Sequence, residues 1–165
     1  MKIRTLTRIA IMGSILFTIF YSFSFILYLE LITFTILVFS LVFKKDTILA
    51  CIIFALINML VNGFTPWNIM YMLIYPSYAC ILSYSSSILI KHMKVVPLIC
   101  GTLSFATGML VDLGFIMFSP TVTLFYVIMG LKTSIIQGCL SAILCLFLFE
   151  PVYNSLMKIR KVHNL

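Results

Sequence analysis

Long apolar stretches make up most of this chain, and they restrict the folds that it can adopt. Of its 165 residues, 63% are hydrophobic and 9% are charged, whereas a soluble domain has roughly a quarter of its residues charged. So few charged side chains cannot cover a surface in contact with water, and the composition predicts an integral membrane protein. The stretches are continuous, which favours spanning helices of about 20 residues over barrel strands of alternating polarity.

The predicted fold is an all-α bundle of six transmembrane helices in one membrane domain, residues 1–165. The helices are expected near residues 9–27, 29–43, 47–62, 68–90, 96–118 and 122–149, and a basic tail follows at 151–165. The first apolar stretch is predicted to be a spanning helix, because it is longer than a signal-peptide core and lacks a small-residue cleavage site.

Ten of the eleven lysines and arginines flank alternate ends of these helices. They precede the first helix, separate the second from the third and the fourth from the fifth, and follow the sixth. Six spans place all ten on one side, and the positive-inside rule then predicts that both termini are cytoplasmic. Topology therefore explains the net charge of +7 without a nucleic-acid partner. It predicts a multi-pass protein of the cell membrane, surrounded by the lipid bilayer.

The segment GFTPWNIMYMLIYPSY, residues 63–78, concentrates aromatic and polar side chains at the predicted outer end of the fourth helix. Tyr71 and Tyr75 are four residues apart and therefore share one helix face. An interfacial aromatic belt explains Trp67 and Tyr71. It explains Tyr75 less well, because Tyr75 lies deeper and is followed by Pro76.

Polar residues in neighbouring helices map to the same outer half of the bundle. Ionisable residues inside a membrane are costly and often functional, and aromatic walls with a few hydrogen-bonding groups are typical of a small-molecule pocket. The sequence therefore predicts a pocket that opens to the outside. The predicted substrate-binding residues are Asn58, Asn62, Trp67, Tyr71, Tyr75, Asp112, Lys132 and Gln137.

Asp112 and Lys132 allow more than one interpretation. Lys132 can bind an anionic group of the ligand, with Asp112 holding the lysine or binding a ligand amine. The two can instead form a structural ion pair between the fifth and sixth helices. In a third interpretation, residues 119–130 form a long or re-entrant outer segment and the last helix begins near Leu131, so that Lys132 reaches water.

The sequence contains no pattern typical of an enzyme, a metal site or a nucleotide site. It has no phosphate-binding loop of the G-x-x-x-x-G-K-[ST] type and no H-E-x-x-H. Both histidines lie outside the predicted helices, and the five cysteines lie in apolar stretches, where cysteine acts as a small hydrophobe. We therefore expect no catalytic residues, no metal and no cofactor, and uphill transport would need energy from another subunit.

Several segments resemble the substrate-binding S components of energy-coupling factor (ECF) vitamin transporters. They are TRIAIMGSI, FSLVFKKDTILACIIFALINML, GFTPWNIMYMLIYPSYACIL and GLKTSIIQGCLSAILCLFLFEPVYNSLMKIRK. The resemblance implies a six-helix bundle whose outward-facing pocket binds a small water-soluble vitamin or related micronutrient. It also implies docking onto a membrane coupling subunit, the T component, which carries two ATPase subunits.

The family's docking motif in the first helix is A-x-x-x-A, and here it reads Ala10-Ile11-Met12-Gly13-Ser14. The resemblance therefore implies that Ala10, Gly13 and Ser14 face the partner. A rod-shape-determining MreD-like scaffold has a similar length and helix pattern, and it is the alternative. The Pro-Trp turn and the aromatic-amide cluster favour the S component.

A stripe of small residues recurs every four positions in the last helix. It consists of Gly130, Ser134, Gly138 and Ala142. Small residues at this spacing let two helix backbones approach closely, so the stripe is predicted to be a packing face, within the chain or against a partner.

Overall fold

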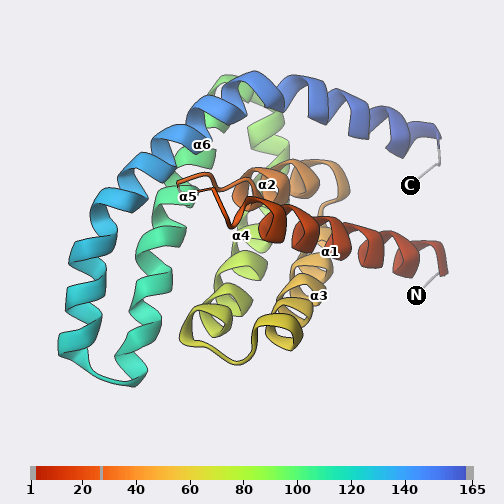
Figure 1. Ribbon diagram of the computed structural model, residues 1–165. Helices are drawn as coiled ribbons and strands as arrows, with labels where there is room; N and C mark the ends of the chain where they lie inside the picture. Colours follow the sequence, from red (N-terminus) through yellow and green to blue (C-terminus); the bar gives the residue numbers. More distant parts are fainter. Residues whose placement is uncertain (1–2, 27, 163–165) are drawn as a thin grey trace.

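The computed structural model describes residues 3–26 and 28–162, and these residues fold into α-helices joined by short connections (Figure 1). The elements are α1 (Ile3–Phe23), α2 (Ile32–Phe43), α3 (Lys45–Asn62), α4 (Pro66–Lys91), the 3-10 turn η1 (Met93–Val95), α5 (Val96–Asp112), the 3-10 turn η2 (Leu113–Met117) and α6 (Pro120–Val162). No strand occurs in these described ranges, and the predicted all-helical class is confirmed.

Within residues 3–26 and 28–162, five segments are long and apolar enough to cross a membrane. They are α1, α3, α4, the segment Met93–Met117 that contains α5, and Pro120–Lys161 of α6. The chain is therefore a multi-pass, all-helical membrane protein.

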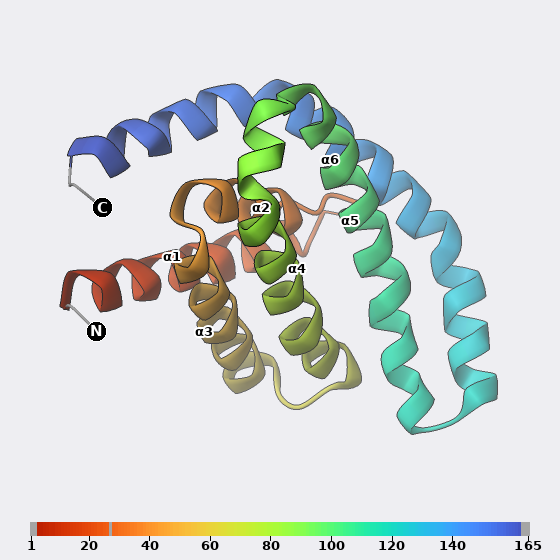
Figure 2. The same ribbon diagram turned by 180° about the vertical axis from the view of Figure 1, so that it is seen from behind.

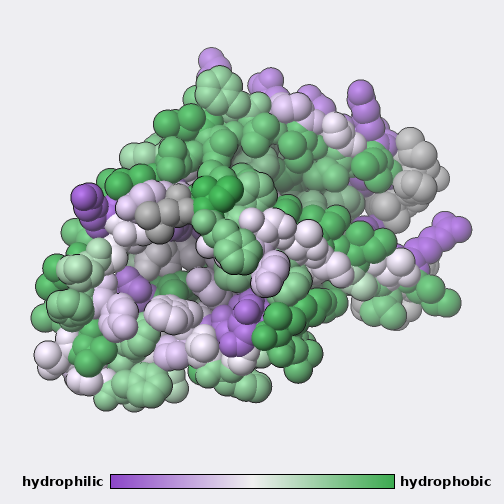
Figure 3. Space-filling view, viewed as in Figure 1, coloured by the Kyte–Doolittle hydropathy of each residue, from purple (hydrophilic) through white to green (hydrophobic). Residues whose placement is uncertain are grey.

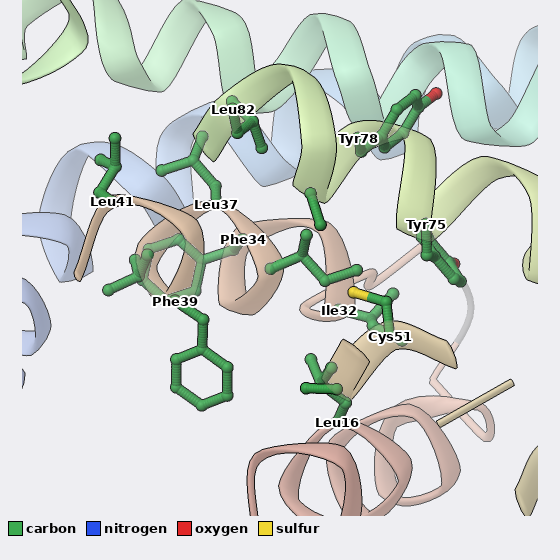
Figure 4. Packing of buried hydrophobic residues seen from close by; sticks show 14 of the residues in the cluster. Leu16, Ile32, Phe34, Leu37, Phe39, Leu41, Cys51, Tyr75, Tyr78 and Leu82 are labelled. Carbon is green, nitrogen blue, oxygen red and sulfur yellow. The ribbon is translucent and has the colours of Figure 1, made fainter. Parts of the chain in front are cut away.

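The remaining helix, α2, is short and lies at the centre of the bundle. Its 12 residues rise about 18 Å, less than the roughly 30 Å of a bilayer's hydrocarbon core. Every residue from Ile32 to Val42 is buried, as expected for a helix that is apolar on all faces. Side chains of α2 such as Leu37 and Phe39 project on different sides of the helix toward the surrounding elements (Figure 4).

Two helical hairpins flank α2. The α3–α4 turn and the α5–α6 turn lie at the same end of the molecule, at the bottom of both views, whereas both termini and η1 lie away from that end (Figures 1 and 2). The segment Met93–Val95 and the α2–α3 junction carry basic residues. The two hairpin turns therefore mark an end of the bundle that is separate from the basic connections.

The small-residue stripe of α6 packs inside the chain, against α5. A Cβ atom added to Gly101 would come within 2.8 Å of both the Ala142 Cβ and the Gly138 carbonyl oxygen. A Cβ at Gly108 would overlap the Ser134 hydroxyl. The absence of side chains at these glycines therefore sets the close approach of the two helices.

Several helix boundaries differ from the sequence prediction, and α6 continues to Val162, so that residues 151–162 of the predicted tail are helical. The α1 helix ends at Phe23, and the segment from Ser24 to Leu31 is a non-helical connection of which Leu27 lies outside the described residues. The α6 helix begins at Pro120 and is continuous through Leu131, so the interpretation with a late helix start is wrong. Proline is well tolerated in the first turn, where its missing N–H has no intrahelical partner.

Candidate small-molecule-binding site

A cavity of about 820 Å³ opens near the end of the bundle that carries the hairpin turns. Its walls come from the second half of α1, the segment Ser24–Ile32, the α3–α4 turn, α4, α5 and α6. Figure 3 shows hydrophilic and intermediate residues gathered in the lower half of the molecule, between apolar surfaces. The volume is within the range of about 300–1,000 Å³ that is typical of ligand sites.

Six of the eight predicted substrate-binding residues line this cavity. They are Asn62, Trp67, Tyr71, Tyr75, Asp112 and Gln137. Asn58 is fully buried behind the wall. Lys132 is exposed on α6 and lies outside the cavity, whereas its neighbours Thr133 and Ser134 face inward. The structure therefore brings together a set of residues that are far apart in the sequence.

A hydrogen-bond network at the α3–α4 turn joins the side chains of Asn58, Asn62, Thr65 and Asn68. The amide of Asn62 donates to Asn58 Oδ1 at 2.7 Å, and the amide of Asn58 donates to Asn68 Oδ1 at 2.8 Å. Asn68 donates its own amide to the Gly63 carbonyl at 2.7 Å, and its backbone N–H donates to Thr65 Oγ1 at 3.2 Å, capping α4. This network stabilises the turn that positions Trp67 in the cavity wall.

Aromatic rings make one wall of the cavity. Tyr71 and Tyr75 stack with centroids 5.3 Å apart and an interplanar angle of 8°. Phe20 of α1 packs edge-on against Tyr71 at 5.3 Å, and Trp67 packs edge-on against Phe115 at 5.2 Å. Because each ring is held by a neighbour, the wall is a preformed surface.

Glu30 lies at the inner end of the cavity, and its carboxylate accepts four hydrogen bonds. Oε1 accepts from Thr33 Oγ1 at 2.6 Å and from the Tyr75 hydroxyl at 3.3 Å. Oε2 accepts from Gln137 Nε2 at 2.9 Å and from the Ser104 hydroxyl. An ionised carboxylate accepts about four hydrogen bonds, so these donors from α2, α4, α5 and α6 satisfy it.

Glu30 is not among the substrate-binding residues predicted from the sequence. One signal was present: Glu30 is one of four acidic residues in the chain, and it stands alone in the apolar run FILYLELITF. An isolated acid in such a run is a functional candidate. Glu30 stands at the very start of the second predicted helix, 29–43, next to the expected connection, and only the folded segment between α1 and α2 turns it inward.

Asp112 has a different environment from Glu30. Its side chain is half-buried at the end of α5 and lines the cavity. A Cβ atom at Gly130 would overlap Asp112 Oδ2, so the glycine leaves the space that the carboxylate occupies. Asp112 makes no side-chain hydrogen bond and no ion pair within 3–26 and 28–162. The predicted ion pair with Lys132 is absent there, because Lys132 points away on the exposed face of α6.

The three predicted docking residues of α1 do not share one environment. Ala10 and Ser14 are exposed, and the Ser14 hydroxyl donates to the Ala10 carbonyl at 3.0 Å. Gly13 is buried against α3, where an added Cβ would lie 2.8 Å from Ile53 Cγ2. Only Ala10 and Ser14 are therefore available on the outer face of α1, since the helix turns Gly13 toward the bundle.

Comparison with known proteins gives no match for this chain. No family model, no curated protein and no solved structure matches it. Function is therefore inferred from the cavity and from the residues that line it.

Proposed function

We propose that this protein captures a small, water-soluble organic molecule within the membrane and acts as the substrate-binding S component of an ECF-type importer. The observation that carries the proposal is the cavity of about 820 Å³. It has aromatic walls and hydrogen-bonding groups within an otherwise apolar bundle, which is the usual composition of a ligand site. An MreD-like scaffold needs no such cavity.

The proposed orientation places the cavity toward the outside. The cavity is lined by the α3–α4 turn, and neither that turn nor the α5–α6 turn carries a lysine or an arginine. The α2–α3 junction carries Lys44 and Lys45, and the α4–α5 connection carries Lys91 and Lys94. The positive-inside rule favours a cytoplasmic location for these connections and for both termini.

The proposed delivery step needs a partner, because the sequence contains no nucleotide-binding motif. The resemblance to S components implies a T component with two ATPases, and the outer face of α1 offers a surface for it. Ala10 and Ser14 lie on that face with the apolar residues Ile11 and Ile15, which are 54% and 40% exposed. Small residues on such a face allow close helix contact.

The binding step is tested on the purified chain in detergent without ATP. Mass spectrometry of the extracted protein is expected to detect a bound small molecule. After its removal, at least one compound from a panel of water-soluble vitamins is expected to raise the melting temperature.

A matched pair of variants tests the site. Trp67→Ala removes a cavity wall and is expected to weaken binding, whereas Tyr84→Ala alters an aromatic residue that is 70% exposed outside the cavity and should leave binding unchanged. A chain that carries no ligand, and that no panel compound stabilises, would favour the scaffold alternative.

A further inference from the structure

We infer that the ligand of this cavity is an organic cation whose positively charged nitrogen binds Asp112. This inference rests on the proposed binding function and adds the charge class of the ligand. The described residues that line the cavity include two carboxyl side chains, Glu30 and Asp112, and no lysine, arginine or histidine. A cavity with this lining favours a cation and disfavours an anion.

The two carboxylates have different roles. Glu30 already accepts four hydrogen bonds from Thr33, Tyr75, Ser104 and Gln137. Its acceptor sites are therefore used by the protein itself. It contributes negative charge to the inner end of the cavity, but it offers little room for a direct contact.

Asp112 is the carboxylate that remains available. It is half-buried at the cavity wall, and within the described part of the chain it has no hydrogen-bond donor and no cationic partner. A carboxylate removed from water is stabilised by an opposite charge. Because Gly130 has no side chain, the carboxylate has space at the α5–α6 contact, and a ligand ammonium can complete the pair.

The aromatic wall suits the same ligand class. Trp67, Tyr71 and Tyr75 all line the cavity, and aromatic faces attract organic cations through their quadrupoles. The stacked pair of Tyr71 and Tyr75 presents flat ring surface for the apolar part of a ligand. The one lysine that could have bound an anion, Lys132, is exposed outside the cavity.

A matched set of three indole compounds tests the charge preference. Tryptamine is a cation at neutral pH, tryptophol is neutral, and indole-3-acetate is an anion, and all three share the same ring. Titrations of the emptied protein in detergent, read by melting temperature and by calorimetry, are expected to rank tryptamine first and indole-3-acetate last.

Variants of Asp112 locate the contact. Asp112→Asn is expected to weaken tryptamine binding by roughly tenfold or more, because the charged partner is lost, and to leave tryptophol binding unchanged. Asp112→Glu is expected to keep the preference for the cation. Glu150→Gln removes an exposed acid of α6 outside the cavity and should change neither titration. The melting temperature without ligand shows whether each variant is folded.

The outcomes separate the two proposals. If tryptophol, indole-3-acetate or an anionic or neutral vitamin binds while no cation does, the binding function holds and the inferred charge class is wrong. Equal loss of tryptamine and tryptophol in Asp112→Asn also overturns the inference. If none of the indoles and no compound of the vitamin panel binds, the proposed binding function itself fails.

Discussion

Replacing Glu30 by leucine removes an acceptor that four side chains share. Thr33, Tyr75, Ser104 and Gln137 then each lose a hydrogen bond inside the bundle. A buried donor left without a partner costs about 1–3 kcal/mol. The four losses are not equal, because some of these donors have a second partner.

The structure indicates which losses matter most. Ser104 lies 2.9 Å from the Ser141 hydroxyl and keeps that contact, whereas the hydroxyls of Thr33 and Tyr75 have no second hydrogen-bond acceptor among the described residues. Gln137 keeps a second, longer bond to the Ser104 carbonyl at 3.2 Å. The equivalent of about two donors therefore stays unsatisfied, which predicts a destabilisation of about 4 kcal/mol.

Thermal unfolding in detergent measures this effect. For a chain of this size, about 4 kcal/mol corresponds to a fall of roughly 8–16 °C in melting temperature. The matched variants Glu30→Gln and Glu150→Gln provide the control. The first places an amide against hydroxyl donors and should show an intermediate loss. The second alters an exposed residue and should leave the melting temperature unchanged.

A Glu30→Leu variant that melts within about 2 °C of the native chain would contradict this prediction. A loss as large in Glu150→Gln would also refute it, since the effect would then follow from removing any acid and not from this hydrogen-bond network.

The remaining predictions concern helix packing, the turn and the proposed docking face. Gly138→Ala adds a Cβ 2.9 Å from the Gly101 carbonyl oxygen and should lower the free energy of unfolding by about 1–3 kcal/mol. The control Cys139→Ala changes an exposed position and should leave the free energy of unfolding unchanged. Equal melting temperatures for the two variants would contradict this prediction. Gly63→Ala meets no atom within 4 Å, but its φ of 78° is unfavourable for alanine, so a loss of about 1–2 kcal/mol is expected in the same assay. Ser14→Leu should abolish uptake in cells and leave ligand binding by the isolated chain intact, whereas Gly13→Leu should lower the melting temperature; unfolding of Ser14→Leu in detergent would show that this face is internal packing.

Hydropathy predicted the interior of each helix because that signal depends only on local sequence. The α3 and α4 helices were predicted at 47–62 and 68–90, and they occupy 45–62 and 66–91. Gly63 and Pro66 make this boundary clear, since glycine permits the positive φ of the turn and proline starts the next helix. The spacing of Tyr71 and Tyr75 likewise predicted their shared face.

The direction in which each side chain faces depends on contacts between distant segments, and the sequence did not supply it. Thr133 and Ser134 line the cavity while Lys132, their neighbour, points outward, because the packing of α6 on α5 sets the rotation of the helix. Glu30 turns inward because donors from four other parts of the chain meet it. Both features require the tertiary structure and have no local pattern.

The enclosed position of α2 has a consequence for how the protein is made. Glu30 bonds with Gln137, 107 residues later, and its backbone carbonyl accepts from Ser141, 111 residues later. At a synthesis rate of roughly 5–20 residues per second, these partners emerge about 5–20 seconds after Glu30. During that interval the Glu30 carboxylate and the side of α2 that faces α6 lack their partners in the folded protein. The bundle can therefore be completed only after α6 has been synthesised.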